Sequence, residues 1–555
     1  MKLVLLTVAL LAAAPSAFAQ PSVGGGGQLR QVPPAPAQPQ SVPDMRIERG
    51  QAPIAPEAAG PRIVVRSLHV TGETRFAEAE LVAATGFRPG AELDLAGIRA
   101  LAGRITDLYN RHGYLVAQAF VPAQDIHNGA VTIEVIEGRY GKIGLSNETN
   151  VWKGLARSVI ADLNPGDVVA TAPLERRLLL LSDFPGVAVK STLTPGDAVG
   201  TSDLLVDLAP GHRITGSLEA DNAGNRYTGQ YRGGGSVNFN EPLGWGDVAS
   251  LRVLTAGSGF NYVRGAYQGR IQNATVGVAY EHLSYRLGKE FAPLHASGTV
   301  DIASLYGSYP LIRSRVSNLY ALADFDDRRF KDKVGATSSV TDKTAQVGIL
   351  GLAGDHRDSL WGGGWTSGSI NWALGDLNIK TPAVRAIDAL TAHSNGSYNK
   401  LSFEVARLQS VGGGPLSLYG EARGQLASKN LDSSEKMELG GAYGVRAYPE
   451  GEAYGDQGYI LTAEARLRLA HLSEMTHGNL QAVAFADHGE VTINKDPWAT
   501  GTNSRSLSAA GVGLTWADRH NLLVKVAYAF KLGSERATSA PDRSGRLWVQ
   551  MSKLF

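Results

Sequence analysis

The stretch YILTAEARLRLA, residues 459–470, alternates between apolar and polar side chains. Side chains of an extended strand point alternately to opposite faces, so this strand has one apolar face and one polar, charged face. Such a strand suits a boundary between lipid and water. The apolar set is Tyr459, Leu461, Ala463, Ala465, Leu467 and Leu469, and the polar set is Thr462, Glu464, Arg466 and Arg468.

The same alternation recurs in NLLVKVAYAFKL, residues 521–532, and helical periodicity is absent from residues 212–555. Backbone groups cannot stay unpaired in a bilayer, and a strand array meets this condition only by closing into a barrel. At roughly 20 residues per strand and connection, this region supplies about 16 strands. The predicted fold is therefore mainly β, a transmembrane β-barrel of about 16 antiparallel strands. Its lumen is wide enough for an aqueous channel unless something fills it.

The region before the barrel begins with export and linker signals. Residues 1–19, MKLVLLTVALLAAAPSAFA, combine a positive Lys2, an apolar run and two small residues, a pattern typical of a secretory signal peptide. The chain contains no cysteine, which excludes disulfides and thiolate metal sites. Residues 20–62 are rich in proline, glycine and alanine, so we expect a linker that carries at most a short helix.

Two similar units follow the linker. In residues 63–138, a β-branched strand precedes DLAGIRALAGRITDLYNRHG, where apolar residues recur at helical spacing between an Asp94 cap and a Gly113 stop. Two further strands end this unit, and residues 139–211 repeat the order of strand, two helices and two strands. The two α+β units resemble POTRA domains, the periplasmic modules of outer-membrane secretion and assembly proteins. The alternative is a pair of unrelated α+β domains.

The last residues, GRLWVQMSKLF, alternate and end on an aromatic side chain, Phe555. Leu547, Val549 and Met551 share one face of this segment. The ending is similar to the signal that outer-membrane assembly machinery reads, although Lys553 stands where another apolar residue is usual. We therefore expect Phe555 to act as an assembly signal and the barrel assembly machinery to be a partner.

The whole mature chain resembles the two-partner secretion transporters, which export filamentous haemagglutinins and haemolysins and belong to the superfamily of barrel assembly factors. The likeness rests on the two POTRA-like units and on four segments in the family's order. The resemblance implies export of a large haemolysin-like or adhesin-like partner exoprotein by type V secretion, through the barrel in the bacterial outer membrane. The segments are ADNAGNRYTGQYRGGGSVNFNEPLGWGD at 220–247, GVRAY at 444–448, FADHGEV at 485–491 and PDRSGRLWVQMSKLF at 541–555.

The resemblance also gives a role to the glycine-rich stretch GGAYGVRAYPEGEAYGDQGY, residues 440–459. In the family, the sixth extracellular loop folds back into the lumen, and the arginine of its Val-Arg-Gly-aromatic tip contacts an aspartate of the inner wall. Here alanine replaces the usual glycine, which would cost about 1 kcal/mol if the position required a positive φ. The matching residues are Val445, Arg446, Ala447 and Tyr448 at the tip and Asp487 on the wall.

On local sequence alone, a surface hairpin loop with a solvated arginine is the simpler interpretation. A guanidinium nevertheless offers forked donors to a carboxylate, and the pairing is stronger where water is partly excluded. We therefore expect residues 440–459 to plug or gate the lumen. The family often places an amphipathic helix before its linker as a second plug. Only GGQLRQVPP, residues 26–34, is available for it here, so we expect a short or reduced helix.

No catalytic, cofactor-binding or metal-binding constellation is visible in the sequence, so we expect no enzyme activity, no cofactor and no bound metal. His471 and His477 flank a predicted turn and His488 follows Asp487, and histidines at barrel ends are more often solvated than metal ligands. The formal net charge of +1 gives no reason to expect a nucleic-acid partner.

The expected partners are outer-membrane lipid around the barrel and a secreted exoprotein. The POTRA-like units, in the periplasm, would capture the N-terminal secretion domain of the exoprotein by adding an extended strand to a sheet edge. Two other functions are compatible with the fold: assembly and insertion of outer-membrane proteins, or a ligand-gated porin. Periplasmic capture modules favour secretion over a porin, and the identity of the client protein separates secretion from assembly.

Overall fold

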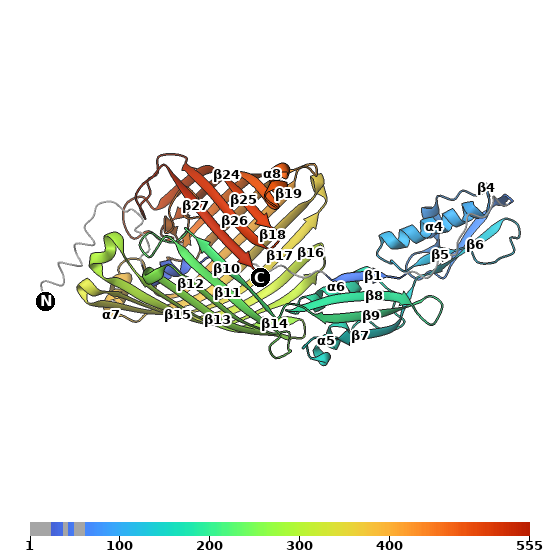
Figure 1. Cartoon of the computed structure of the whole chain (residues 1–555), viewed down its shortest axis with the longest axis horizontal. Helices are drawn as coiled ribbons and strands as arrows, with labels where there is room; N and C mark the ends of the chain where they lie inside the picture. The colour runs from blue at the N-terminus through green and yellow to red at the C-terminus, as the bar shows by residue number, and fades with distance from the viewer. Residues whose placement is uncertain (1–23, 37–42, 49–60) are drawn as a thin grey trace.

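The computed structural model describes residues 24–36, 43–48 and 61–555. A β-barrel and two small α+β domains lie in a row along the long axis of the molecule (Figure 1). The C-terminus lies toward the end of the barrel that joins these domains. The predicted signal peptide, residues 1–19, and about half of the predicted linker fall outside the described residues.

Sixteen strands form a closed barrel in which neighbours in the chain pair with each other and the last strand pairs antiparallel with the first. The predicted fold class is therefore confirmed. The strands are β10 (Ile214–Asp221), β11 (Arg232–Asn240), β12 (Val248–Thr255), β13 (Phe260–Ile271), β14 (Ala274–Arg286), β15 (Ala296–Arg313), β16 (Ser317–Val334), β17 (Ser339–Asp358), β18 (Gly364–Ile379), β19 (Gly396–Ser410), β20 (Leu416–Ala427), β23 (Gln457–Arg468), β24 (Gly478–Thr492), β25 (Ser504–Asp518), β26 (Leu522–Lys531) and β27 (Gly545–Leu554).

Along the barrel strands, side chains alternate between the outer and the inner face of the wall. On β23, Leu461 and Leu467 are exposed on the outer surface, whereas Glu464 lies between them on the inner face. Apolar side chains therefore meet lipid and charged ones line the lumen. Most connections at the end near the α+β domains are short, and longer loops join the strands at the distal end. The remaining short helices are η1 (Gly257–Gly259), η2 (Lys289–Leu294), η3 (Gly335–Thr337), η4 (Leu360–Gly362), α7 (Pro382–Asp388) and α8 (Ala470–Met475).

The first α+β domain packs helices on a three-stranded sheet of order β3-β6-β5. Its elements are β2 (Ile63–Val65), β3 (Ser67–Thr71), α3 (Glu78–Thr85), β4 (Ala91–Leu93), α4 (Leu95–Arg111), β5 (Gln118–Phe120) and β6 (Ala130–Ile136). Helix α4 starts at the predicted cap, because the Asp94 carboxylate accepts a 2.7 Å hydrogen bond from the backbone N–H of Gly97. It ends next to Gly113, whose φ of 86° suits glycine. No helix among the described residues is long and apolar enough to cross a membrane.

The second domain contains a strand that comes from the predicted linker. Its own elements are β7 (Arg139–Asn147), α5 (Lys153–Ile160), α6 (Thr171–Ser182), β8 (Val187–Pro195) and β9 (Thr201–Pro210). Strand β1 (Asp44–Ile47) extends the sheet to the order β1-β8-β9-β7 and runs parallel to β8. Met45 and Ile47 pack against the core of this domain. Residues 44–47 are therefore not free linker, because their alternating apolar side chains fit an open sheet edge.

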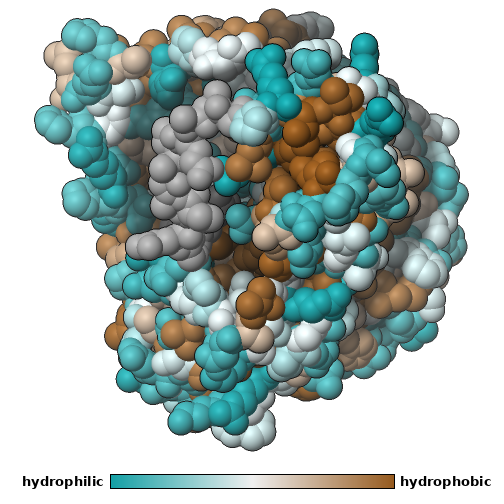
Figure 2. Space-filling model, turned by 90° about the vertical axis from the view of Figure 1, so that its right-hand side faces the viewer, coloured by the Kyte–Doolittle hydropathy of each residue, from teal (hydrophilic) through white to brown (hydrophobic). Residues whose placement is uncertain are grey.

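Charged contacts hold the second domain against the barrel. The Asp183 carboxylate accepts hydrogen bonds of 3.0 and 2.7 Å from the Arg313 guanidinium at the end of β15. Arg270 on β13 donates to the carbonyl oxygens of Leu180 and Asp183, and its guanidinium lies 4.8 Å from the ring centroid of Phe184. Such contacts fix the orientation of the domain relative to the lumen. Figure 2 views the molecule from this end, where polar residues surround separate apolar patches.

Candidate functional site

The connection between β20 and β23, residues 428–456, folds back into the barrel, and we call it the lumen loop. It is the sixth connection at the distal end of the barrel, and it contains the short strands β21 (Met437–Glu438) and β22 (Tyr454–Gly455). Its bounds differ from the predicted 440–459. The loop starts earlier because β20 ends at Ala427, and it stops earlier because β23 already pairs with β24 from Gln457.

Arg446, at the tip of the lumen loop, forms an ion pair with Asp487 on β24. Its Nε and Nη2 atoms donate hydrogen bonds of 2.9 and 2.7 Å to the two carboxylate oxygens, and its backbone N–H donates a third of 3.1 Å. The Asp487 side chain is 0% exposed and the Arg446 side chain 14% exposed. Both charges are largely removed from water, so each depends on the other for stabilisation.

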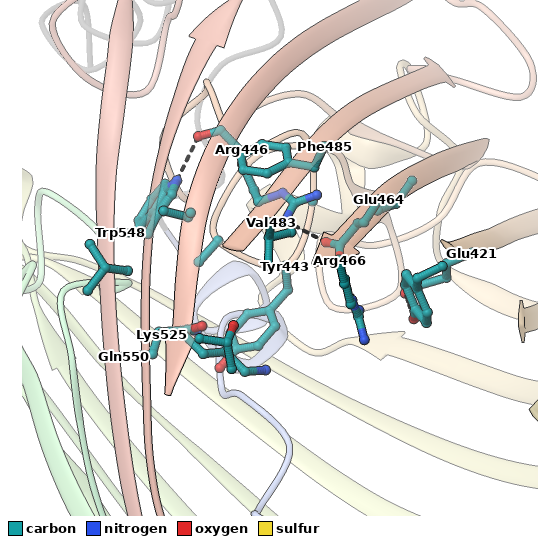
Figure 3. Close-up of a pocket in the computed structure, with 18 of the residues that line it drawn as sticks. Glu421, Tyr443, Arg446, Glu464, Arg466, Val483, Phe485, Lys525, Trp548 and Gln550 are labelled. Carbon is teal, nitrogen blue, oxygen red and sulfur yellow. Dashed lines mark hydrogen bonds and ion pairs between the residues drawn. The ribbon is translucent and has the colours of Figure 1, made fainter. Parts of the chain in front are cut away.

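Three residues outside the predicted site also hold Arg446 (Figure 3). Its Nη1 atom donates a 2.8 Å hydrogen bond to Oε1 of Glu464 on β23. Its guanidinium carbon lies 3.5 Å from the ring centroid of Phe485, and its carbonyl oxygen accepts a 2.6 Å bond from Nε1 of Trp548 on β27. Alternation already places Glu464 on the polar face of its strand, but no local pattern shows which loop residue it meets.

The other tip residues are buried by apolar contacts. Val445, Ala447 and Tyr448 are each 0% exposed and share one core cluster with Phe485. The backbone of Ala447 does not adopt a positive φ, so alanine in place of the family's usual glycine carries no left-handed penalty here. The Tyr448 hydroxyl donates a 3.1 Å bond to the backbone carbonyl of Glu535 in the last distal loop. The whole tip is therefore seated against β24, β25, β26 and their loops.

The first part of the lumen loop is held by a different set of strands. Glu435 accepts a 2.6 Å hydrogen bond from Lys400 on β19 and a second bond from Arg328 on β16. Asp432 accepts a 2.7 Å bond from Lys343 on β17. The loop thus presents carboxylates to cations of the wall at its start and a cation to carboxylates of the wall at its tip. These paired charges brace it across the lumen.

A second segment also lies in the lumen. Helix α2 (Gly25–Arg30) is as short as the sequence predicts, yet it is buried and bonded at both ends. The Gly25 N–H donates a 2.9 Å bond to Asp332 on β16, and Nε2 of Gln31 donates a 2.8 Å bond to the hydroxyl of Tyr454 in the lumen loop. Six residues are too few for a stable isolated helix, so the surrounding wall and loop supply its stability.

Beside the tip, a cavity of about 430 Å³ remains open (Figure 3). It is lined by side chains of both signs, a composition typical of a wet passage rather than of an apolar ligand pocket. The described residues contain no group of three or more His, Cys, Asp or Glu that could hold a metal ion. The charged lining residues are Glu404, Glu421, Arg423, Arg446, Glu464, Arg466 and Lys525.

Phe555 lies at the seam of the barrel, away from the lumen loop. Its N–H donates a 3.1 Å bond to the carbonyl of Gly216 on β10, and its carbonyl accepts a 2.9 Å bond from the N–H of Gly216. Strands β10 and β27 pair over residues 217–221 and 550–554, which makes this the shortest pairing in the barrel. Phe555 therefore extends the seam by one further residue pair.

Known proteins match the chain along most of its length. The sequence-family model of the haemolysin secretion/activation protein ShlB/FhaC/HecB matches residues 200–516, and the sequence-family model of the ShlB-type POTRA domain matches residues 63–138. The heme/hemopexin transporter protein HuxB of Haemophilus influenzae is 27% identical over 475 residues, which cover 84% of this chain and 82% of HuxB. The outer membrane transporter CdiB of Dickeya dadantii is 23% identical over 483 residues, which cover 84% and 83% of the two chains.

Solved structures share the architecture. CdiB from Escherichia coli superposes with a TM-score of 0.67 at 20% identity and covers 91% of this chain and 93% of its own. BamA from Haemophilus ducreyi without POTRA domains 1–3 gives a TM-score of 0.56 at 12% identity, over 89% and 100% of the two chains. At such identities the likeness shows the fold, whereas the family model covers more than half of the sequence. The chain therefore belongs to the haemolysin secretion/activation family ShlB/FhaC/HecB, the outer-membrane transporters of two-partner secretion.

Proposed function

We propose that this chain exports a large partner exoprotein through its barrel and that the lumen loop closes the passage at rest. The buried ion pair between Arg446 and Asp487 carries this proposal, because it holds the tip of the lumen loop against the inner wall of the barrel. A substrate must supply contacts that replace the pair before the loop can move. Secretion of the exoprotein by cells that carry the intact or the Arg446-substituted transporter tests the proposal.

The driving force follows from what the sequence lacks. No phosphate-binding loop is visible in it, and the periplasm has no nucleotide supply. Folding of the exoprotein outside the cell would then pull the chain outward. The transporter would act through a gate and not through a catalytic centre.

We infer that the POTRA-like domains capture an extended segment of the partner as an added strand. The β8 edge of the second domain is already occupied, because β1 pairs with it from Asp44 opposite Lys190 to Ile47 opposite Leu193. Strand β1 takes the position that a partner strand would need. Capture at this edge therefore requires release of β1.

Replacing both Met45 and Ile47 by aspartate should increase capture of the partner's N-terminal secretion domain by roughly two- to tenfold. Both side chains are partly buried against the core of the second domain, and an unpaired charge in that contact would displace β1. The measurement is the affinity of the purified transporter for the isolated secretion domain. Arg46→Asp is the matched control, because Arg46 lies on the same strand with its side chain 75% exposed. Unchanged or weaker capture by the double variant would place the capture edge elsewhere.

Removal of Phe555 should lower the amount of assembled barrel several-fold. The deletion removes two backbone hydrogen bonds to Gly216 at the shortest strand pairing and the aromatic side chain that the assembly machinery is expected to read. The readouts are the level in the outer membrane and the heat-dependent shift in gel mobility. Phe555→Tyr keeps the aromatic ring and should assemble normally. Normal assembly of the shortened chain would reject the role of Phe555.

A further inference from the structure

The outer face of the barrel changes character along β14, β15 and β16. Toward the α+β domains this face is apolar, with Val278, Leu305 and Phe325 exposed in one band. The band ends at Tyr280, whose hydroxyl donates a 2.7 Å hydrogen bond to Asp301 on the neighbouring strand. An aromatic side chain with its hydroxyl bonded to a charged neighbour is typical of the edge of the hydrocarbon layer. Beyond Tyr280, the outward residues are polar or charged.

Three cations lie on this distal part of the outer face. Strand register places Arg286 opposite Ser297, Ser297 opposite Lys333 and Thr299 opposite Lys331, so all of them share the outward face with Tyr280. We call Arg286, Lys331 and Lys333 the outer basic patch. All three side chains are exposed. They line a depression of about 350 Å³ together with the hydroxyl and amide groups of Ser258, Asn261, Ser284, Ser297 and Thr299.

The cations of the outer basic patch form no direct ion pair among the described residues. Among the described residues, none of its three cations lies within 4.0 Å of a carboxylate oxygen, although Asp342 stands opposite Lys331 in register. By contrast Arg329, the next outward residue of β16 toward the membrane, is paired with Asp327 at 3.1 Å. Three neighbouring positive charges repel one another unless an anion lies between them. Arginine and lysine donors beside hydroxyl groups suit the oxygens of a phosphate.

We propose that the outer basic patch binds phosphate groups of the glycolipid in the outer leaflet, lipopolysaccharide. The patch faces outward and continues the lipid-contacting face, so the molecule next to it is a lipid headgroup. Lys331 and Lys333 lie four and six residues beyond the level of Tyr280 along the strands. At 3.3 Å per residue and a tilt of about 40°, this is roughly 10–15 Å past the edge of the hydrocarbon layer, where phosphorylated sugars would lie.

The same strands hold the contents of the lumen. On β16, Asp332 lies between Lys331 and Lys333 and points inward, where it accepts the hydrogen bond from Gly25 of α2. Arg328 on the same strand holds Glu435 of the lumen loop. A lipid bound outside would therefore stiffen the part of the wall that seats both α2 and the start of the lumen loop.

The test is binding of purified bisphosphorylated lipid A to the full-length transporter in detergent. The triple variant Arg286→Gln, Lys331→Gln, Lys333→Gln should raise the dissociation constant at least roughly tenfold, since it removes three charged donors. Arg385→Gln in α7 is the matched control, because Arg385 is an exposed cation of a distal loop that does not line the depression. It should change the constant less than twofold.

Three results would overturn the proposal. Wild-type affinity in the triple variant would show that lipid A does not use the outer basic patch. Displacement of lipid A by an equal concentration of inorganic phosphate would assign the patch to a free anion and not to a lipid. Lys331→Arg and Lys333→Arg keep the charge and should keep lipid A binding. These two variants can be measured even if the triple variant fails to assemble. Loss of lipid A binding in both of them, with the barrel intact, would contradict recognition of lipid A by positive charge.

Discussion

Arg446→Ala is expected to cut secretion of the partner exoprotein at least tenfold while the barrel still assembles. The change removes the two guanidinium donors of Arg446 from the buried Asp487 carboxylate, which keeps only the backbone N–H of residue 446 and the Thr462 hydroxyl as donors. Breaking a buried ion pair by removing one partner costs about 3–5 kcal/mol. The tip of the lumen loop would then leave its seat on β24. The measurement is secreted partner per assembled transporter.

A control variant that removes one positive charge elsewhere in the lumen distinguishes the effect of losing the loop contact from the effect of changing the charge of the lumen. Arg264 is paired with Glu281 at 2.9 Å on the inner faces of β13 and β14, and the pair does not include the lumen loop. Arg264→Ala should reduce secretion less than twofold. A reduction equal to that of Arg446→Ala would mean that lumen charge, and not the seat of the loop, sets the export rate.

Asp487→Ala should have an effect of similar size, and the two alanine changes should not add. Either alanine change alone already breaks the ion pair. The second change then has no pair left to break, so the double variant should secrete about as much as either single variant. The reciprocal exchange Arg446→Asp with Asp487→Arg restores opposite charges but not the forked geometry, and only partial recovery is expected. Strict additivity, or no effect of either change, would reject the pairing as a functional contact.

The second large effect is expected from deletion of residues 63–138. None of the barrel's strand pairs involves this domain, so the barrel should assemble at close to the normal level. Secretion should fall below about a tenth of normal, because we propose that both POTRA-like domains take part in capture of the partner. The measurement again compares secreted partner with assembled transporter.

A point variant checks that the deletion acts through the domain itself. Ile105 is fully buried in the core of the first domain, and Ile105→Asp should unfold that domain and reproduce the loss of secretion. Arg104, its neighbour, is not in that core, so Arg104→Lys should secrete normally. Undiminished export by the deletion variant would show that recognition of the partner lies in the second domain or the barrel.

The barrel was predictable because its signal is local. In each strand, apolar and polar residues alternate because one face contacts lipid and the other faces the lumen, as in residues 459–470. The closed sheet follows from the need to pair every backbone group in the bilayer. The strand number follows from length alone. The helix after Asp94 was predictable for the same reason, since cap and periodicity lie within a few residues of each other.

Contacts between distant segments were not predictable in this way. Strand β1 forms only because it pairs with an open edge of β8, a strand that lies far from it in the sequence. Residues 44–47 are too few to predict a strand on their own. The position of α2 depends on donors and acceptors of the wall, such as Asp332, that no local pattern connects with Gly25. The resemblance paired Arg446 with Asp487, but the roles of Glu464 and Trp548 depend on strand register, which alternation does not specify.

Export as proposed requires that the partner passes through the lumen of the barrel. Glu404 and Val405 are neighbours on β19, and Glu404 lines the cavity beside the loop tip whereas Val405 faces lipid. A photoreactive amino acid placed at each position, with a partner exoprotein stalled in transit by a folded C-terminal domain, tests the route directly. Passage through the lumen predicts crosslinks to the stalled partner from position 404 and none from position 405. Crosslinks from 405 alone, or equal crosslinks from both, would contradict it.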